Sequence, residues 1–187
     1  MNWGTVYIHI MISNQKLTLR QLIPEDKNSF IEAVKIFKND IPPWEFAFHF
    51  DEQSDFQEYL EKLENWSIGI DLPENFVPNT FLVGVLEGKI IGRVSIRHRL
   101  TDYLERIGGH VGYGVIHSYR RRGFATEMLK QAISVCFSLK INQILVTCDE
   151  DNIGSRKVIE KCGGVFENIT DYPELEIQKR RYWISSK

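Results

Sequence analysis

The sequence lacks the features that direct a protein into a membrane or onto a nucleic acid. None of its apolar runs reaches the roughly 18 residues of a membrane-spanning helix. Its 23 basic and 25 acidic residues give a formal net charge of −2, which does not indicate binding to nucleic acid or to a membrane surface. The apolar segment 1–12 lacks the basic start and the cleavage site of a signal peptide. We therefore predict a cytoplasmic protein without nucleic-acid or membrane partners.

Cysteine is scarce, and its spacing does not indicate a metal site. The three cysteines, Cys136, Cys148 and Cys162, form no CxxC pair, and each lies among apolar residues. An odd number without paired spacing argues against a disulfide framework and against a zinc site. We predict reduced cysteines in the core and no bound metal.

Two familiar phosphate-binding patterns, GxxxxGK[ST] and GxGxxG, are also absent. The chain has instead "HSYRRRGFATEMLKQAI" at 117–133, where three arginines and a glycine precede a helical pattern. The preceding stretch, "HVGYGVI" at 110–116, alternates as a β-strand does. The helix is predicted by apolar residues at three- and four-residue spacing: Ala125, Met128, Leu129, Ala132, Ile133 and Cys136.

A strand, a basic loop and a helix in this order can bind an anion. Unpaired N–H groups at the helix start, the helix dipole and the arginines all favour negative charge. Thr126 and Glu127 fall in the first predicted turn, where a hydroxyl can cap the helix and a carboxylate opposes its dipole. A helix entry with merely solvated arginines is the alternative, and the loop alone does not decide between the two.

The rest of the chain predicts one α+β domain. Its 187 residues, 43% of them hydrophobic, are enough for one substantial core. Antiparallel hairpin signals come first and alternating strands and helices come later, which favours α+β over a doubly wound sheet. The further predicted helices lie at 24–39, 51–66 and 152–161, and the further strands at 16–23, 80–98 (a hairpin turning at Glu87-Gly88), 143–148, 164–170 and 179–185.

Two motifs carry a resemblance to a known family. Arg120, Gly123 and Ala125 match the [Q/R]-x-x-G-x-[G/A] pattern of the GNAT superfamily of N-acetyltransferases, which likewise sits between a strand and a long helix. A later stretch resembles the family's second signature, because Asn152 opens a predicted helix that ends in "EKCGG" at 160–164. The two motifs have the order and separation that the family shows.

The resemblance covers nearly the whole chain from Lys16 onward, with 41–79 as the variable, acceptor-side part. It implies an N-terminal extension, 1–15, followed by a single N-acetyltransferase domain, 16–187. The implied fold is a mixed, mostly antiparallel central sheet flanked by helices, in which the fourth and fifth strands splay apart.

The family transfers the acetyl group of acetyl-CoA to a primary amine by direct attack in a ternary complex. The resemblance therefore implies acetyl-CoA as co-substrate, lying between the splayed strands with its pyrophosphate in the basic loop. The implied cofactor-binding residues are Tyr113, Val115 and Ile116 on the strand; Arg120, Arg121, Arg122, Gly123, Phe124, Ala125 and Thr126 in the loop and helix start; and Asn152 and Ser155 at the next helix.

His110 is the first candidate for the base that deprotonates the amine. It lies on the strand that borders the implied site, where several family members place a catalytic Glu or His. An imidazole with its ordinary pKa of about 6.5 can accept a proton at neutral pH. Glu105 and Asp149 are the alternatives, and His117 fits a contact with phosphate or solvent. A histidine that fills a polar niche at a strand start is the other interpretation of His110.

The acid that the family often uses toward the leaving thiolate is missing. It is a tyrosine seven residues after the helix-opening asparagine, and this position is Ile159 here. Ser155, Cys162 and Tyr172 are candidate replacements. The thiolate can also leave unassisted, because a thiol with a pKa of about 8.5 is a fair leaving group.

The implied acceptor is a small-molecule or peptide amine, bound by a monomer or a homodimer. Glu45, Asp51 and Glu52 could attract a cationic amine. Two functions of other classes stay open: a non-catalytic acyl-CoA-binding module, motivated by Ile159, and a protein–protein interaction module built on "WEFAFHF" at 44–50. The aromatic residues that could wall an amine site, or simply form core, are Trp44, Phe46, Phe48, Phe56, Tyr59 and Trp66.

Overall fold

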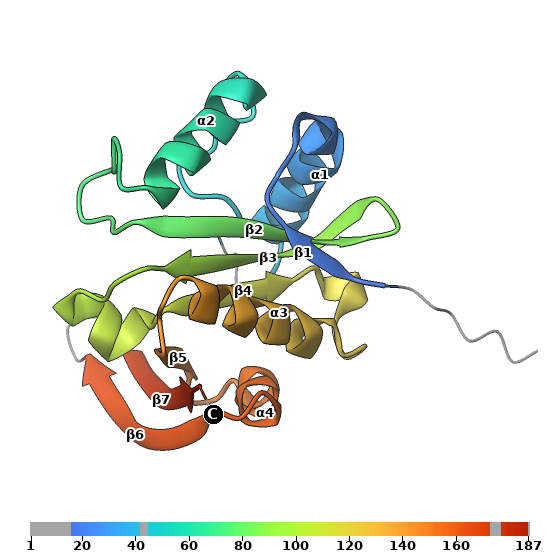
Figure 1. The fold of residues 1–187 in the computed structure, drawn as a ribbon. Helices are drawn as coiled ribbons and strands as arrows, with labels where there is room; N and C mark the ends of the chain where they lie inside the picture. The colour runs from blue at the N-terminus through green and yellow to red at the C-terminus, as the bar shows by residue number, and fades with distance from the viewer. Residues whose placement is uncertain (1–15, 42–44, 173–176, 187) are drawn as a thin grey trace, which may run out of the picture.

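The computed structural model describes residues 16–41, 45–172 and 177–186 of the chain. Within these ranges the strands form two sheets whose ladders are antiparallel (Figure 1). The first has the order β1-β2-β3-β4 and consists of β1 Thr18–Arg20, β2 Asn79–Leu86, β3 Lys89–Arg97 and β4 Val111–Val115. The second has the order β5-β7-β6 and consists of β5 Gln143–Asp149, β6 Val165–Tyr172 and β7 Ile177–Ser185.

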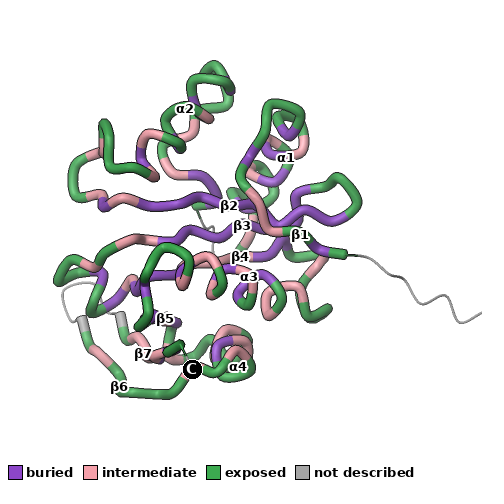
Figure 2. Tube along the Cα trace, in the orientation of Figure 1, coloured by how far each residue is buried: buried purple, intermediate pink, exposed green. Residues whose placement is uncertain are grey.

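Helices cover both faces of the first sheet, and each face has its own apolar core. The first two helices lie on one face, and the third lies on the other face, beside the second sheet (Figure 1). Buried residues run along β2 and β3, between the two cores (Figure 2). The helices are α1 Lys27–Lys38, α2 Phe56–Ser67, α3 Phe124–Ser138 and α4 Ile153–Lys161.

Local chemistry sets where these helices begin. Asp55 caps α2, because its carboxylate accepts a hydrogen bond from Gln57 N–H at 2.7 Å. Asn152 caps α4 through the N–H of Ser155 at 2.9 Å. The predicted first helix starts as a 3₁₀ turn at Pro24–Asp26, and α1 follows it directly. The elements predicted from periodicity are therefore present, and the α+β fold class is confirmed.

The gap between β4 and β5 matches the predicted splay of the fourth and fifth strands. In the described part of the chain, the backbone hydrogen bond that joins the two strands at their starts runs from His110 N–H to Leu145 O, at 2.7 Å. Beyond this point the strands belong to different sheets. A strand edge without a partner presents free N–H and C=O groups. One edge of β4 is therefore available to a ligand.

The segment that leads into β4 was not predicted. Residues Leu104–Gly108 form a short π-helix, and Ile107 O accepts a hydrogen bond from Thr147 Oγ1 at 2.6 Å. Gly109 follows with φ of 64°, and a β-carbon there would lie 2.7 Å from Leu145 O. Only glycine satisfies both the left-handed backbone and the close approach. This turn brings the start of β4 against β5.

All three cysteines are free. Burial raises the pKa of Cys136 to about 12 and that of Cys148 to about 11. Both thiols are therefore protonated at neutral pH, and the prediction of reduced cysteines in the core is confirmed for these two. Cys162 is half-buried, and its Sγ lies 3.6 Å from Thr126 O.

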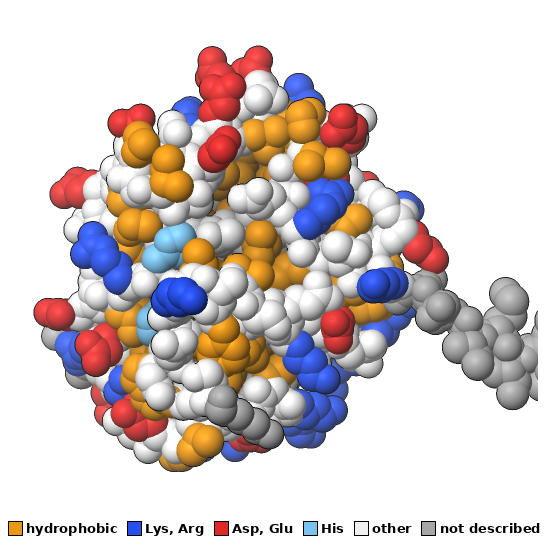
Figure 3. Space-filling view, in the orientation of Figure 1, with side chains coloured by type: hydrophobic (Ala, Val, Ile, Leu, Met, Phe, Trp, Pro, Cys, Tyr) orange, Lys and Arg blue, Asp and Glu red, His pale blue; other side chains and the backbone are white. Residues whose placement is uncertain are grey.

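The face of the molecule drawn in Figure 3 mixes acidic and basic side chains, with hydrophobic ones between them. Among the described residues, no helix is long and apolar enough to span a bilayer, and no group of three His, Cys, Asp or Glu side chains could hold a metal ion. The cytoplasmic location and the absence of a metal stay predictions. The predicted extension 1–15 lies outside the described residues.

Candidate active site

The loop between β4 and α3 has a backbone suited to an anion. Arg121 (φ 63°) and Gly123 (φ 87°) are both left-handed. N–H groups around such turns can converge on an anion, and the first N–H groups of a helix have no helical acceptor. A β-carbon at Gly123 would meet no atom within 4 Å, so the space in front of the loop is open. Gly123 is the N-cap of α3 without a side-chain cap, and the suggested capping by Thr126 is not observed.

Arg120 holds this loop in place. Its Nε donates to Val115 O at 2.9 Å, and its Nη2 pairs with Asp40, which follows α1. The guanidinium thus links the end of β4 to the opposite face of the sheet. These contacts suit Arg120 to positioning the loop, and its predicted contact with the phosphates stays a prediction.

The other two loop arginines, Arg121 and Arg122, differ in the number of contacts that their side chains make. The Arg122 guanidinium lies over the rings of Tyr119 and Phe124, 5.5 Å and 5.1 Å from their centroids. Arg121 has no hydrogen-bond, salt-bridge or ring partner within the described ranges and is exposed. Of the three, Arg121 is therefore the arginine best able to contact a phosphate.

The register of β4 leaves alternate main-chain groups free. Ile116 N–H donates to β3 and His110 O accepts from β3, both at 2.8 Å. Even-numbered residues of β4 therefore point their main-chain groups toward β3, and Tyr113 and Val115 point theirs away from it, into the gap. Of these, Val115 O already accepts from Arg120 Nε. Ile116 O also accepts from Tyr119 N–H at 2.9 Å. Ile116 thus has no free main-chain group, which argues against its predicted contact with the cofactor.

The Tyr113 side chain spans the gap toward α4. Its hydroxyl donates to Ser155 O at 3.4 Å, and it interacts electrostatically with Cys148 of β5. Burial raises the pKa of Tyr113, so the phenol stays protonated at neutral pH. Asn152 and Ser155 therefore lie at the same opening as Tyr113, as their predicted role in cofactor binding requires.

His110 lies at the closed end of the gap. It is 8% exposed, and its Nδ1 accepts a hydrogen bond from Leu145 N–H at 2.9 Å. Burial, with a smaller effect from the charge of Arg97, lowers the pKa of His110 from 6.5 to about 4. The lone pair that a base needs is already used, and the ring is a weak base. This geometry argues against His110 as the catalytic base and favours the interpretation as a residue that fills a polar niche.

The alternative bases are not better placed. Glu105 lies on the π-helix and is exposed. Asp149 is exposed at the end of β5, and its carboxylate pairs with Lys179. Neither lines the large cavity described below. Glu74 and Asp102 are the carboxylates that do line it, and neither was singled out from the sequence.

The residue in place of the family's tyrosine belongs to the core. Ile159 is 0% exposed, and a β-carbon at Gly164 would lie 2.5 Å from Ile159 Cγ2. The position has no room for a phenol. Burial raises the pKa of Cys162, and the side chain of Tyr172 lies outside the described residues.

A cavity of about 900 Å³ opens beside β3 and the turn into β4. Ser95 and Arg97 of β3 line it together with Asn79 of β2. Its lining includes the aromatic residues Phe48 and Phe76, whose rings are in contact, and charged residues. The other lining residues are Glu74, Asn75, Val77, Arg99, Leu100, Thr101, Asp102, Tyr103 and Leu104. The size and composition suit a small organic substrate.

Most of the aromatic residues considered for an amine site are core. The exposed fraction is only 2% to 4% for four of them: Phe46, Phe56, Tyr59 and Trp66. Phe48 is half-buried and does line the cavity. Trp44 lies outside the described residues. Phe46 and Ala47 of the segment 44–50 are buried with residues of α1 and α2. This leaves few exposed apolar side chains with which a protein–protein interaction module could bind a partner.

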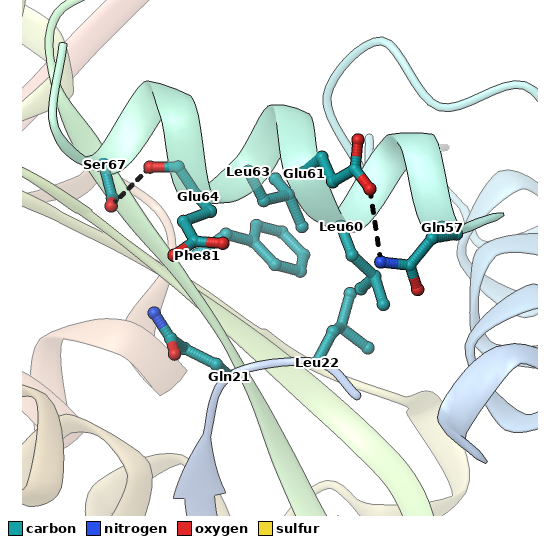
Figure 4. A pocket seen from close by; sticks show the side chains of 9 residues that line it. All are labelled: Gln21, Leu22, Gln57, Leu60, Glu61, Leu63, Glu64, Ser67 and Phe81. Atoms are coloured by element: carbon teal, nitrogen blue, oxygen red, sulfur yellow. Dashed lines mark hydrogen bonds between the residues drawn. The ribbon is translucent and has the colours of Figure 1, made fainter. Parts of the chain in front are cut away.

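A second, smaller cavity of about 170 Å³ lies between α2, β2 and the segment that follows β1 (Figure 4). Its carboxylate and amide groups come mainly from α2, where Gln57 Nε2 donates to Glu61 Oε1 at 3.4 Å. It contains no part of the basic loop or of β4. We therefore place the candidate site at the larger cavity and the β4–β5 gap.

The family follows from these features together with a comparison of the sequence. A family model described as "Acetyltransferase (GNAT) domain" matches residues 16–165. The chain belongs to the GNAT acetyltransferase family. A relative, "Uncharacterized N-acetyltransferase YjdG" of Bacillus subtilis (strain 168), is 30% identical over 59 residues, which are 31% of this chain and 35% of that protein. The match thus spans about a third of the relative's length.

Solved structures share the GNAT fold over nearly the whole chain. Ribosomal-protein-S5-alanine acetyltransferase from Vibrio fischeri has a TM-score of 0.68 at 21% identity, covering 90% of this chain and 92% of that one. The putative acetyltransferase yncA from Salmonella typhimurium, solved with its cofactor acetyl-CoA, has a TM-score of 0.58 at 14% identity, covering 90% and 93%. At these identities the likeness concerns the fold.

Proposed function

We propose that this GNAT protein transfers the acetyl group of acetyl-CoA to a primary amine, by direct attack while both substrates are bound. The observation that carries the proposal is the free edge of β4, which leads to the basic loop, together with the large cavity, which is lined by Ser95 and Arg97 of the neighbouring strand β3. A thioester cofactor anchored by its phosphates at one end needs such an edge for its amide groups. An acceptor needs the cavity at the other end.

The residues present fit acetyl-CoA. The N–H groups of the loop and Arg121 would hold the phosphates, and the main-chain groups of Tyr113 and the N–H of Val115 would pair with the cofactor's amides. The open space in front of Gly123 leaves room for the pyrophosphate. Bound acetyl-CoA supplies the thioester, and the remaining chemistry falls to the acceptor cavity and to Tyr113.

The acceptor must lose a proton before it attacks, because an ammonium has no lone pair. We propose that the protein has no dedicated histidine base. The charge of Arg93, whose guanidinium lies over the Phe48 ring of the cavity wall, disfavours a further positive charge there and lowers the pKa of a bound amine. The proton then leaves to solvent through the open cavity.

We assign to Tyr113 the role of hydrogen-bond donor to the leaving thiolate. Its phenol lies in the gap between β4, β5 and α4 and is protonated at neutral pH. It can donate a hydrogen bond to the departing sulfur. In this way it would replace the family's tyrosine, whose position is occupied by Ile159 here. A thiolate is already a fair leaving group, so a hydrogen bond rather than a complete proton transfer is sufficient.

Release of free thiol from acetyl-CoA, measured across a panel of amines with mass spectrometry of the products, tests the activity. We expect thiol release that depends on the amine, together with one acetyl group on the product. A non-catalytic acyl-CoA-binding module, which Ile159 still favours, would bind acetyl-CoA without releasing thiol for any amine. A protein without affinity for CoA would contradict both.

A further inference from the structure

Two arginines of β3 lie side by side over one glycine of β4. Gly112 pairs with Ser95, which stands between Arg93 and Arg97 on β3. A β-carbon at Gly112 would lie 3.5 Å from Arg97 Nη1, 3.6 Å from Arg97 Nη2 and 3.9 Å from Arg93 Nη1. The missing side chain of Gly112 thus leaves the space that both guanidinium groups use.

Burying two positive charges close together costs free energy, because both lose hydration and repel each other. Arg93 is 2% exposed, and burial together with the charge of Arg97 lowers its pKa to about 9, an effect that Glu45 partly opposes. Burial also lowers the pKa of Arg97, and the group that opposes this is the Tyr103 hydroxyl. Buried charges in proteins are normally paired with an opposite charge. Arg97 forms no salt bridge within the described ranges, so a nearby anion would stabilise its buried charge.

Arg97 is the member of the pair that can meet a ligand. Its Nη1 is held by Gly108 O at 3.1 Å and Gly109 O at 3.2 Å. Within the described ranges it forms no salt bridge, and its Nε and Nη2 have no hydrogen-bond acceptor. Arg97 lines the cavity. The two carbonyls thus fix the guanidinium while one side of its donor fork remains for a substrate.

The surroundings favour a carboxylate on an otherwise apolar molecule. Arg93 lies behind Arg97, with its guanidinium over the ring of Phe48 at 4.8 Å and Nη2 bonded to Glu45 O at 3.0 Å. Phe48 and Phe76 of the cavity wall are in edge contact, 5.8 Å apart. A guanidinium fork matches the planar, bidentate geometry of a carboxylate.

We infer that the acceptor of this enzyme is an amine that also carries a carboxylate, and that Arg97 binds this carboxylate in the cavity. Such an acceptor is an amino acid or a short peptide with a free carboxyl group near its amine. The inference rests on the proposed acetyl transfer, which it narrows to a substrate class. It replaces the earlier suggestion that Glu45, Asp51 or Glu52 recruits a simple cationic amine.

The test compares matched pairs of acceptors that differ in one charge. The standard amino acids and their carboxamides are titrated by calorimetry into the protein saturated with CoA, and both sets are assayed with acetyl-CoA. We expect at least one acid to bind about 10- to 100-fold more tightly than its amide, the range for a charge-assisted contact. The ratio of kcat/KM should shift in the same direction.

Variants then assign the effect to Arg97. Arg97→Gln should abolish the preference for the acid while leaving the affinity for CoA unchanged, and Arg97→Lys should retain part of it. Lys89→Gln removes a positive charge from the exposed start of the same strand and should keep the full preference. Because the acid and its amide are compared in the unaltered protein, the inference stays testable even where an Arg97 variant does not fold.

The outcomes separate this inference from the proposed function. Equal binding and equal turnover of acids and amides would overturn the carboxylate site while leaving acetyl transfer intact. Selective binding of an acid to the CoA-loaded protein without any turnover would support the carboxylate site and contradict the transfer. Preference for phosphorylated amines over the carboxylated ones would also overturn the inference.

Discussion

His110 and Leu145 are joined by two hydrogen bonds at the closed end of the β4–β5 gap. His110 N–H donates to Leu145 O at 2.7 Å, and Leu145 N–H donates to His110 Nδ1 at 2.9 Å. The second bond requires a neutral ring with its proton on Nε2. The two hydrogen bonds of His110 therefore mark the point from which the two strands diverge.

The first prediction separates this role from catalysis. His110→Asn keeps a side-chain acceptor for Leu145 N–H, and His110→Ala removes it. We expect His110→Asn to keep kcat within a few-fold and His110→Ala to lose about 1–3 kcal/mol of folding stability, because a buried N–H loses its acceptor. A fall in kcat of about 10²–10⁴-fold in both variants, without a loss of stability, would restore His110 as the base.

The lowered pKa of His110 gives a prediction of how folding stability depends on pH. The pKa of His110 is lowered from 6.5 to about 4 in the folded protein. Between these values the unfolded chain binds a proton that the folded chain does not, so this group makes stability fall as the pH is lowered from about 6.5 to about 4. Denaturant titrations across this range should show a shallower fall in His110→Asn than in the unaltered protein.

The phosphate site can be tested with an isosteric pair at Gly123. Asn and Asp strain the left-handed backbone equally (φ 87°), but only Asp places a negative charge against a phosphate. We expect Gly123→Asp to abolish CoA binding in calorimetry and Gly123→Asn to weaken it modestly. Gly163 has nearly the same backbone (φ 89°) and open space, so Gly163→Asp controls for strain. Equal affinities for the Asn and Asp variants at Gly123 would show that the phosphates bind elsewhere.

The loop arginines should contribute unequally. Arg121 has an uncommitted guanidinium in the described structure, whereas Arg122 is held over Tyr119 and Phe124. We expect Arg121→Ala to weaken CoA binding by about 1–3 kcal/mol and Arg122→Ala to weaken it less. The affinity of the unaltered protein should also fall as salt is raised. Affinities that do not change with salt would contradict the electrostatic site.

Tyr113→Phe tests the assigned role in thiolate departure. The variant keeps the ring and the main chain that face the gap and loses only the hydroxyl. We expect kcat to fall about 10-fold or more with the affinity for CoA unchanged, because the lost hydrogen bond forms to the leaving sulfur. An unchanged kcat would show that the thiolate leaves without help. Restoring the family's tyrosine by Ile159→Tyr should instead cost about 1–3 kcal/mol of stability through overpacking.

The sequence predicted the fold well, because the fold depends on local patterns; the cofactor-binding residues stay predictions. The periodicity of α3, the alternation in β4 and the cap at Asn152 each involve residues within a few positions of one another. The confirmed splay came from the family resemblance, which carries information about long-range order.

The remaining features depend on contacts between residues far apart in the chain. Nothing near His110 in the sequence indicates that Leu145, 35 positions later, uses its lone pair. In the same way, Arg93 and Arg97 appear in a strand that alternates normally, and only the pairing with β4 places them over Gly112. Two arginines within one largely apolar stretch are the sequence signal that could have indicated this site, since charged residues are unusual in a strand that is buried on both faces.

The central claim is that acetyl-CoA lies along the free edge of β4, and amide hydrogen exchange measured by NMR tests it most directly. Addition of CoA should slow the exchange of the Tyr113 and Val115 amides and of the amides in the loop from Arg121 to Thr126. Gly112 and Gly114, whose main-chain groups already face β3, should change little. The account predicts this alternation along β4. Uniform slowing along β4, or slowing confined to the cavity under α2, would contradict it.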